Sequence, residues 1–160
     1  MKSPAAPILN RADLLSAIER SRSAGLTIAL ANGCFDLFHV GHLRYLIGAA
    51  QFADVLVVAV NSDAQASKLK GEGRPYINEA ERAEIVASVR VVDLVTVFDE
   101  ATVEEILLAV KPEFHVKGTD YTVDTVPERE VVLSYGGRVA IAGDPKDHSS
   151  TELIERIAER

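Results

Sequence analysis

Two histidines stand three positions apart where a helix is expected to begin. His39 and His42 close the segment Asn32–His42, which follows a run of apolar residues and leads into a helical pattern. Side chains three apart lie on one side of a helical turn, and imidazoles can donate hydrogen bonds to phosphate oxygens. The free N–H groups of a helix start also attract anions, and Gly41 allows a phosphate chain to approach the backbone closely. The segment therefore predicts a phosphate site.

Other interpretations of the histidine pair stay open at this point. Either ring could be an exposed helix cap or a satisfied core histidine. A zinc site would need a third ligand, and neither a nearby cysteine pair nor a His-Glu-x-x-His arrangement is present. An oxidoreductase that binds a dinucleotide lacks support, because the first loop contains no Gly-x-Gly-x-x-Gly.

A second candidate phosphate site precedes the last predicted helix. Ser149, Ser150 and Thr151 follow His148 and stand just before an apolar-periodic segment. Taken alone, one of these hydroxyls could simply cap the helix, which is worth about 1 kcal/mol of stability. Two donor-rich helix starts in one chain nevertheless favour a clamp around phosphates. The hypothesis requires His39 and Ser150 to share one cavity.

The elements that must position these residues alternate along the chain. Short apolar runs predict strands at 27–31, 55–60, 94–98, 114–117 and 138–142. Helical patterns follow at 10–25, 39–50, 78–89, 102–110, 127–135 and 149–159, while 61–74 is interpreted only as a polar, lysine-bearing segment. This alternation predicts an α/β, Rossmann-like, doubly wound and mostly parallel five-stranded sheet with helices on both faces. Ligands should bind beyond the carboxyl ends of its strands.

Length and composition limit the class of protein. The 160 residues fit one domain, 1–160, with residues 1–8 expected to be a flexible tail. A formal charge of -7 argues against a nucleic acid partner, and no apolar run is long enough to span a membrane. The chain has a single cysteine, Cys34, and no secretion signal is apparent, so we expect a reducing, cytoplasmic location.

The first loop resembles a known signature. It carries Gly33, Phe35, Asp36, His39, Gly41 and His42, as does the cytidylyltransferase-like nucleotidyltransferase superfamily with its His-x-Gly-His motif. The resemblance implies that His39 and His42 are catalytic and stabilise charge on the triphosphate and the leaving pyrophosphate. It implies that Asp36 organises the loop or lies near a metal-bound phosphate, and that Asn32, Gly33, Phe35 and Gly41 help to bind the nucleotide.

Further similarities extend over residues 27–158. Val60-Asn61-Ser62-Asp63 and Leu69-Lys70-Gly71 resemble family segments, as do Arg74-Pro75 and Arg82. The resemblance implies that Lys70 reaches the phosphates as a third catalytic residue. It also implies that Asn61, Asp63 and Arg74 bind the acceptor substrate. Taken alone, Lys70 would be interpreted as a solvated surface lysine.

The loop after the fourth predicted strand resembles another family turn. It reads Lys117-Gly118-Thr119-Asp120-Tyr121, and the resemblance places Lys117, Gly118 and Asp120 beside the nucleotide. Gly118 is expected to permit a tight turn, although a purely structural turn capped by Asp120 stays open. The resemblance also implies that Ser149, Ser150 and Thr151 bind the β and γ phosphates.

The implied activity is transfer of a nucleoside monophosphate from a nucleoside triphosphate, accompanied by Mg²⁺, to a phosphorylated acceptor. The branch that the chain is most similar to is the heptose-1-phosphate adenylyltransferases. The alternative is a glycerol-3-phosphate cytidylyltransferase, but its Arg-Thr-x-Gly stretch is replaced here by Asp144-Pro145-Lys146-Asp147. In addition, Ile154 stands where several other branches of the superfamily have Arg or Lys. No protein side chain is assigned to the metal. The resemblance suggests a homodimer, and a nucleotide-sensing domain without turnover is the non-enzyme alternative.

Overall fold

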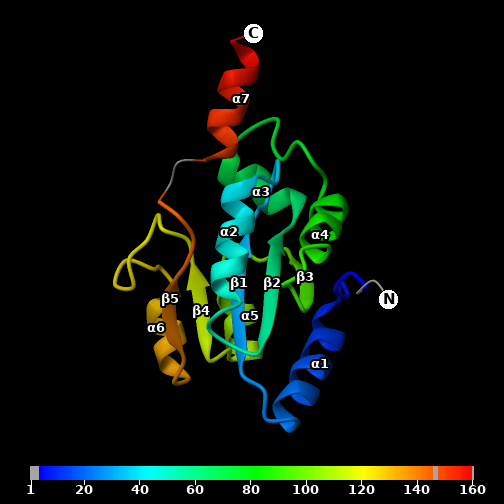
Figure 1. The fold of residues 1–160 in the computed structure, drawn as a ribbon, viewed down its shortest axis with the longest axis vertical. Coiled ribbons are helices and arrows are strands. Elements are labelled where there is room, and N and C mark those ends of the chain that lie inside the picture. Colours follow the sequence, from blue (N-terminus) through cyan, green and yellow to red (C-terminus); the bar gives the residue numbers. More distant parts are fainter. Residues whose placement is uncertain (1–3, 146–147, 160) are drawn as a thin grey trace.

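Five parallel strands form one sheet in the order β3-β2-β1-β4-β5 (Figure 1). The computed structural model describes residues 4–145 and 148–159. The strands are β1 (Ile28–Gly33), β2 (Val55–Asn61), β3 (Leu94–Phe98), β4 (Phe114–Lys117) and β5 (Arg138–Ile141). The predicted Rossmann-like sheet is therefore confirmed. Strand order reverses between β1 and β4, which is where such sheets bind ligands.

Helices cover both faces of this sheet, as predicted. They are α1 (Arg11–Ser23), α2 (Val40–Ala49), α3 (Asp63–Lys70), α4 (Glu79–Ala87), α5 (Glu104–Val110), α6 (Arg129–Ser134) and α7 (Ser150–Ala158). Successive side chains of a strand point to opposite faces, so Ala29 and Ala31 pack with α2 and α4. Ile28 and Leu30 pack with α1, α5 and α6 on the other face.

Helix α3 lies in the segment that the sequence did not predict as regular structure. Ser62 caps it by accepting a hydrogen bond from the Gln65 backbone N–H at 3.2 Å, and the helix ends at Gly71, whose φ is +102°. Only Gln65 and Ala66 are buried, while Leu69 is 61% exposed. The segment lacks an apolar stripe, so hydrophobic periodicity could not reveal the helix.

The chain before α1 is attached to the edge of the sheet. Ile8 forms a parallel bridge with Val95, and hydrogen bonds join Ala6 to Ala87 and Leu9 to Val95. Residues 6–8 of the expected tail therefore have backbone partners in α4 and β3. Residues 1–3 of that tail lie outside the described residues. No helix within 4–145 and 148–159 is long and apolar enough to cross a membrane.

Helix α7 lies apart from both apolar cores. It extends beyond the end of the sheet at which β4 ends (Figure 1), and none of its described residues is buried. Ser149 caps it by accepting a hydrogen bond from the Glu152 backbone N–H at 3.0 Å. The N-terminus of α7 therefore lies at the same edge as the loops that follow the strands.

Candidate active site

A cavity of about 310 Å³ opens beyond the ends of β1 and β4. Its size is near the lower end of the range usual for small-molecule sites. Five segments bring predicted site residues to its wall: Asn32, Gly33, Phe35 and Asp36 after β1; His39, Gly41 and His42 at the start of α2; Lys70 and Arg74 in and after α3; Lys117, Gly118 and Asp120 after β4; Ser149, Ser150 and Thr151 at the start of α7. His39 and Ser150 thus share one cavity, as the phosphate-clamp hypothesis requires.

Two predicted substrate-binding residues do not line this cavity. Asn61 is 5% exposed and its side-chain oxygen lies 3.7 Å from Cys34 Sγ. The Asp63 carboxylate pairs with Arg82 at 2.9 Å, behind the first loop. Asn61 thus contacts the Cys34 side chain, and Asp63 is linked to the first loop only through Arg82, which donates to the Cys34 carbonyl. Of the three predicted acceptor-binding residues, only Arg74 lines the cavity.

Several lining residues were not predicted. They are Cys34, Tyr45, Thr119, Tyr121, Ala142, Gly143, Asp144, Pro145 and His148. Tyr45 follows His42 by three positions, so helical spacing on the same face could have identified it. Gly143 adopts a φ of +100°, and its position against the Tyr45 backbone depends on tertiary packing that spacing does not reveal. Lys146 and Asp147, part of the departure from the cytidylyltransferase pattern, lie outside the described residues.

The two predicted catalytic histidines form a reciprocal cap at the start of α2. His39 Nδ1 accepts a hydrogen bond from the Gly41 N–H at 3.0 Å, and His42 Nδ1 lies 3.4 Å from the His39 N–H. The rings stack with centroids 3.9 Å apart. Because each Nδ1 acts as acceptor, the proton of each neutral ring is assigned to Nε2. Both rings therefore keep an Nε2–H donor for a ligand.

Gly41 is required by this arrangement. A Cβ at this position would stand 2.8 Å from His39 Cε1 and 2.9 Å from His39 Nδ1, which is closer than side chains approach one another. Any larger residue would push the ring away from the N–H group that fixes its tautomer. The glycine therefore permits the close approach of the His39 ring to the backbone, in addition to the approach of a ligand expected from the sequence.

Burial favours the neutral form of both histidines near neutral pH. Burial lowers the pKa of His42 to about 3, and the His39 and Lys70 charges act in the same direction while Asp36 opposes them. Burial also lowers the pKa of His39, with a smaller contribution from His148. Neutral imidazoles can donate from Nε2 and can accept a proton when negative charge develops nearby. These properties suit stabilisation of a polyanion.

The Asp36 carboxylate joins the first loop to the segment after α3. It accepts hydrogen bonds from Arg74 Nε at 2.8 Å and from the backbone N–H groups of Tyr76 at 2.9 Å and Ile77 at 3.1 Å. Burial would raise the pKa of Asp36, but these N–H groups and the Arg74 charge outweigh it and hold the pKa below its ordinary value. These contacts suit the expected role of Asp36 in organising the loop, and its role beside a metal-bound phosphate stays a prediction.

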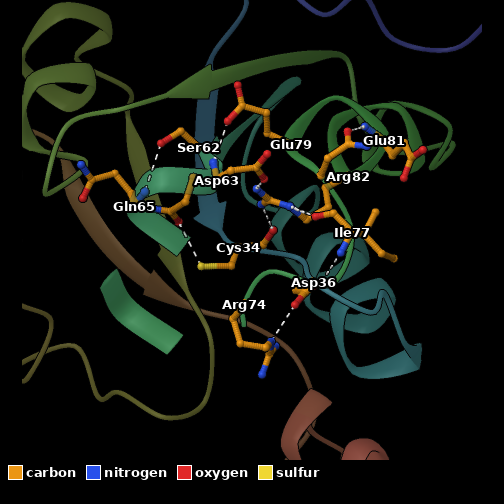
Figure 2. Close-up of polar contacts among 12 residues, drawn as sticks. Cys34, Asp36, Ser62, Asp63, Gln65, Arg74, Ile77, Glu79, Glu81 and Arg82 are labelled. Atoms are coloured by element: carbon orange, nitrogen blue, oxygen red, sulfur yellow. Dashed lines mark hydrogen bonds and ion pairs between the residues drawn. The ribbon is translucent and has the colours of Figure 1, made fainter. Parts of the chain in front are cut away.

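Arg82 connects the same loop to two further segments (Figure 2). Its guanidinium is fully buried and donates to the Cys34 carbonyl at 2.5 Å, the Ile77 carbonyl at 2.8 Å and the Asp63 carboxylate at 2.9 Å. The planar guanidinium donates to these three acceptors from three different nitrogen atoms, which the single ammonium nitrogen of a lysine cannot do. The adjoining loop contains Phe35 and Leu37 at positive φ, a conformation that non-glycine residues rarely adopt without support.

The two helix starts are joined directly. Ser150 Oγ donates a 2.6 Å hydrogen bond to the backbone carbonyl of Asp36, a residue 114 positions earlier in the chain. This contact places the N-terminus of α7 beside the histidine loop. The N-termini of α2 and α7 therefore converge on one cavity, where their dipoles favour an anion.

On the β4 side, Lys117 lies with its Nζ 4.9 Å from the centre of the Tyr121 ring. Burial lowers the pKa of Lys117, and the carboxylates of Glu128 and Asp120 oppose that effect. Gly118 has no positive φ, and nothing stands within 4 Å of where its Cβ would be. The turn itself does not require a glycine, contrary to the sequence argument, and the open space above Gly118 belongs to the cavity.

A pH dependence of stability follows from the buried His115 of β4. Burial lowers its pKa to about 3, and the Lys117 charge adds to this effect. An unfolded histidine has a pKa of about 6.5, so over this interval only the unfolded chain binds the proton and stability falls as pH falls. Below about pH 6, we expect the free energy of unfolding to change less steeply with pH in His115→Leu than in the wild type, by up to about 1.4 kcal/mol per pH unit. Urea titrations of both proteins at several pH values measure this, and identical slopes would contradict it.

The fold and the cavity define a Rossmann-like protein with a cationic cavity beyond the ends of its strands, and comparison with known proteins identifies the family. The model of the cytidylyltransferase-like family matches residues 30–156. The chain belongs to that family.

Within and beyond this family, the chain is similar to several individual proteins. The chain is 46% identical over 150 residues to a protein named Bifunctional protein HldE from Syntrophotalea carbinolica, and this match covers 94% of the chain. It is also 46% identical over 153 residues to the protein of the same name from Pelobacter propionicus, and that match covers 96% of the chain. The chain spans only 31% of the length of each of these relatives. The fold also resembles the crystal structure of a lipopolysaccharide core biosynthesis protein from Thermoplasma volcanium. That likeness has a TM-score of 0.66 and 26% identity, and it covers 76% of this chain and all of that one.

Proposed function

We propose that the protein transfers an adenylyl group from ATP to a heptose 1-phosphate, with release of pyrophosphate. The observation that carries the proposal is the convergence of two imidazole donors and two helix N-termini on one cavity. The Asn-Gly-x-Phe-Asp and Lys-Gly-x-Asp-Tyr motifs of the heptose branch support the acceptor, as do the two HldE relatives and the lipopolysaccharide core protein.

The charge of the cavity supports an anionic ligand. The whole chain carries -7, yet Lys70, Arg74 and Lys117 all line the cavity. Arg74 Nη2 is buried and has no hydrogen-bond partner among the described residues, although Nε of the same side chain binds Asp36. A buried donor without an acceptor costs free energy, which a phosphate oxygen in the cavity would recover.

The reaction would be a direct in-line displacement. An oxygen of the acceptor phosphate attacks the α-phosphorus, and the bond from that phosphorus to the bridging oxygen breaks as pyrophosphate leaves. His39, His42 and Lys70 stabilise the charge that develops on the leaving group. Burial raises the pKa of the Cys34 thiol, although the Lys70 and Arg82 charges oppose this, so Cys34 is a poor candidate for a covalent intermediate.

The lining residues suit phosphates better than a resident metal ion. Within 4–145 and 148–159, no group of three or more His, Cys, Asp or Glu side chains is arranged to hold a cation. The Asp36 carboxylate is engaged with Arg74 and backbone N–H groups, and the Asp144 carboxylate pairs with Arg44 at 2.6 Å. We therefore propose that Mg²⁺ enters with the triphosphate as part of the substrate and offsets its charge.

A matrix of triphosphates against phosphorylated acceptors tests the activity, with pyrophosphate release as the readout. We expect the ATP and heptose 1-phosphate pair to give the fastest release. Faster release with CTP and glycerol 3-phosphate would assign the alternative cytidylyltransferase activity. Nucleotide binding without release from any pair would instead support the sensing domain. The expected homodimer and cytoplasmic location stay predictions, and light scattering of the purified protein checks the former.

Arg74 offers a specific prediction for this site. Lysine at this position can retain one contact to Asp36 but cannot present a second donor in the same plane. We expect Arg74→Lys to raise the KM for one of the phosphorylated substrates by about tenfold, since a charge-assisted hydrogen bond is lost. Steady-state kinetics with each substrate varied in turn measures this effect. Unchanged KM values for both substrates would show that Arg74 only supports the loop.

A further inference from the structure

A buried histidine that the proposed chemistry does not use contacts a residue of the cavity wall. His115 lies on β4 with none of its surface exposed, and its Nε2 is 3.0 Å from Asn32 Oδ1. Asn32 is the second-last residue of β1, the strand next to β4, and it lines the cavity. The other ring nitrogen, Nδ1, is buried and has no partner among the described residues.

The missing partner of Nδ1 distinguishes the two possible tautomers. If Nε2 were the acceptor, the Asn32 amide would donate to it, and the His115 proton would be on Nδ1 as a buried N–H without an acceptor. If Nε2 carries the proton, it donates to Asn32 Oδ1, and Nδ1 is only an unused acceptor. Orphaned buried N–H groups are rarer in proteins than unused acceptors, so the second arrangement is favoured.

We propose that His115 is a positioning residue that fixes the polarity of the Asn32 amide. With Oδ1 held by the His115 Nε2–H, the Asn32 amide nitrogen is the atom left to interact with a ligand. Asn32 then acts in the cavity as a hydrogen-bond donor and recognises an oxygen acceptor of the nucleotide. This deepens the proposed function and rests on it for the identity of the ligand, but not for the tautomer.

The orientation of the Asn32 amide, which the hydrogen bond from His115 sets, does not change with pH near neutrality. Burial keeps the ring neutral well below neutral pH, since the pKa of His115 is lowered to about 3, with Lys117 adding to the effect. The charge that acts on this ring is that of Lys117, two residues along the same strand. A neutral histidine on one strand therefore sets a fixed donor on the next.

Nitrogen NMR of the ligand-free protein tests the tautomer directly. Long-range proton–nitrogen correlation of the ¹⁵N-labelled chain distinguishes Nε2–H, Nδ1–H and cationic rings, and His115→Leu identifies the signals of His115 by their loss. We expect a neutral Nε2–H ring. A neutral Nδ1–H ring or a cation near neutral pH would overturn the proposal, whether or not the protein is active.

A matched pair of variants tests the consequence for binding. Glutamine can place an amide donor near the position of Nε2, whereas leucine cannot donate. We expect His115→Leu to raise the KM for the triphosphate by about fivefold with little change in kcat, and His115→Gln to stay close to the wild type. Equal KM values in the two variants would overturn the positioning role.

A variant of Asn32 tests its donor role. Asn32→Asp keeps the shape but replaces the amide nitrogen with a charged acceptor, so we expect weaker triphosphate binding than in Asn32→Ala, measured by calorimetry. The reverse order would overturn the proposal. If the wild type releases no pyrophosphate from any substrate pair, the proposed activity fails, while the NMR result and the calorimetric order still decide this inference.

Discussion

Asparagine in place of His42 is expected to lower turnover by about a hundredfold while changing the melting temperature little. The asparagine side-chain oxygen can occupy the position of His42 Nδ1 and accept the hydrogen bond from the His39 N–H. The helix cap is then retained, and the group lost is the Nε2–H donor. Because that donor would act on charge that develops in the transition state, its loss should lower kcat more than it raises KM.

His42→Ala separates the two contributions of this residue. Alanine removes the donor and also the cap, whereas the ring contacts with Phe35 and Phe38, whose centroids both lie 5.4 Å from that of His42, are lost in both variants. We expect a similar loss of turnover and, in addition, a lower melting temperature. Wild-type turnover in His42→Asn together with a large loss of stability in His42→Ala would mean that the histidine is structural. Pyrophosphate release and thermal unfolding of the three proteins measure these outcomes.

A second large effect is expected from Asp36→Asn, which should lower the free energy of unfolding by about 3 kcal/mol. The carboxylate is 2% exposed, and each of its oxygens accepts hydrogen bonds from the loop that contains Arg74, Tyr76 and Ile77. Asparagine turns one of these acceptors into a donor facing other donors, and it leaves the Arg74 guanidinium without its counter-charge. Turnover should fall as well, since the histidine loop and Arg74 lose their common support.

Asp124→Asn is the matched control for this substitution. The Asp124 side chain is 87% exposed, lies 3.7 Å from Arg129 and does not line the cavity, and such exposed pairs contribute little. We expect no more than about 0.5 kcal/mol of change in its free energy of unfolding by urea titration. A loss of that small size in Asp36→Asn would show that the buried carboxylate does not stabilise the fold.

The pH dependence of the Asp36 effect has a definite sign. The pKa of Asp36 is lowered in the folded state, so its contribution is fully present above the unfolded value of about 3.9 and is lost as pH falls through the folded value. The difference between the wild type and Asp36→Asn should therefore be constant near neutral pH and shrink below about pH 4. A difference that grew on acidification would assign the carboxylate the opposite role.

The sequence predicted those parts of the site that depend on local spacing. His39 and His42 occur within one helical turn, and Ser149 precedes an apolar-periodic helix, so both helix starts could be recognised. Strand alternation also placed Lys117 at the end of a strand beside the first loop. Each of these features depends on residues near one another in the chain, where periodicity and capping preferences apply.

Contacts between distant segments could not be predicted in this way. Arg82 stands on a helix where a surface position is the ordinary expectation, yet it is fully buried because three acceptors from separate loops surround it. Asp63 follows a strand end in a matched motif, which favoured a ligand contact, and its pairing with Arg82 could not be predicted from that position. The partner of His115 likewise depends on the β1 and β4 register, which no single segment specifies.

The hydrogen bond from Ser150 to the Asp36 carbonyl has a consequence for folding order. It joins residues 114 positions apart, so we expect β2, β3 and β4 to become ordered before α7 reaches its place. Contacts between residues so far apart in the sequence form late, because the entropic cost of closing the loop must be offset by contacts that have already formed. A nascent chain that ends before α7 therefore carries the imidazoles without the hydroxyls, and full affinity for a triphosphate arises only when synthesis has passed the final helix.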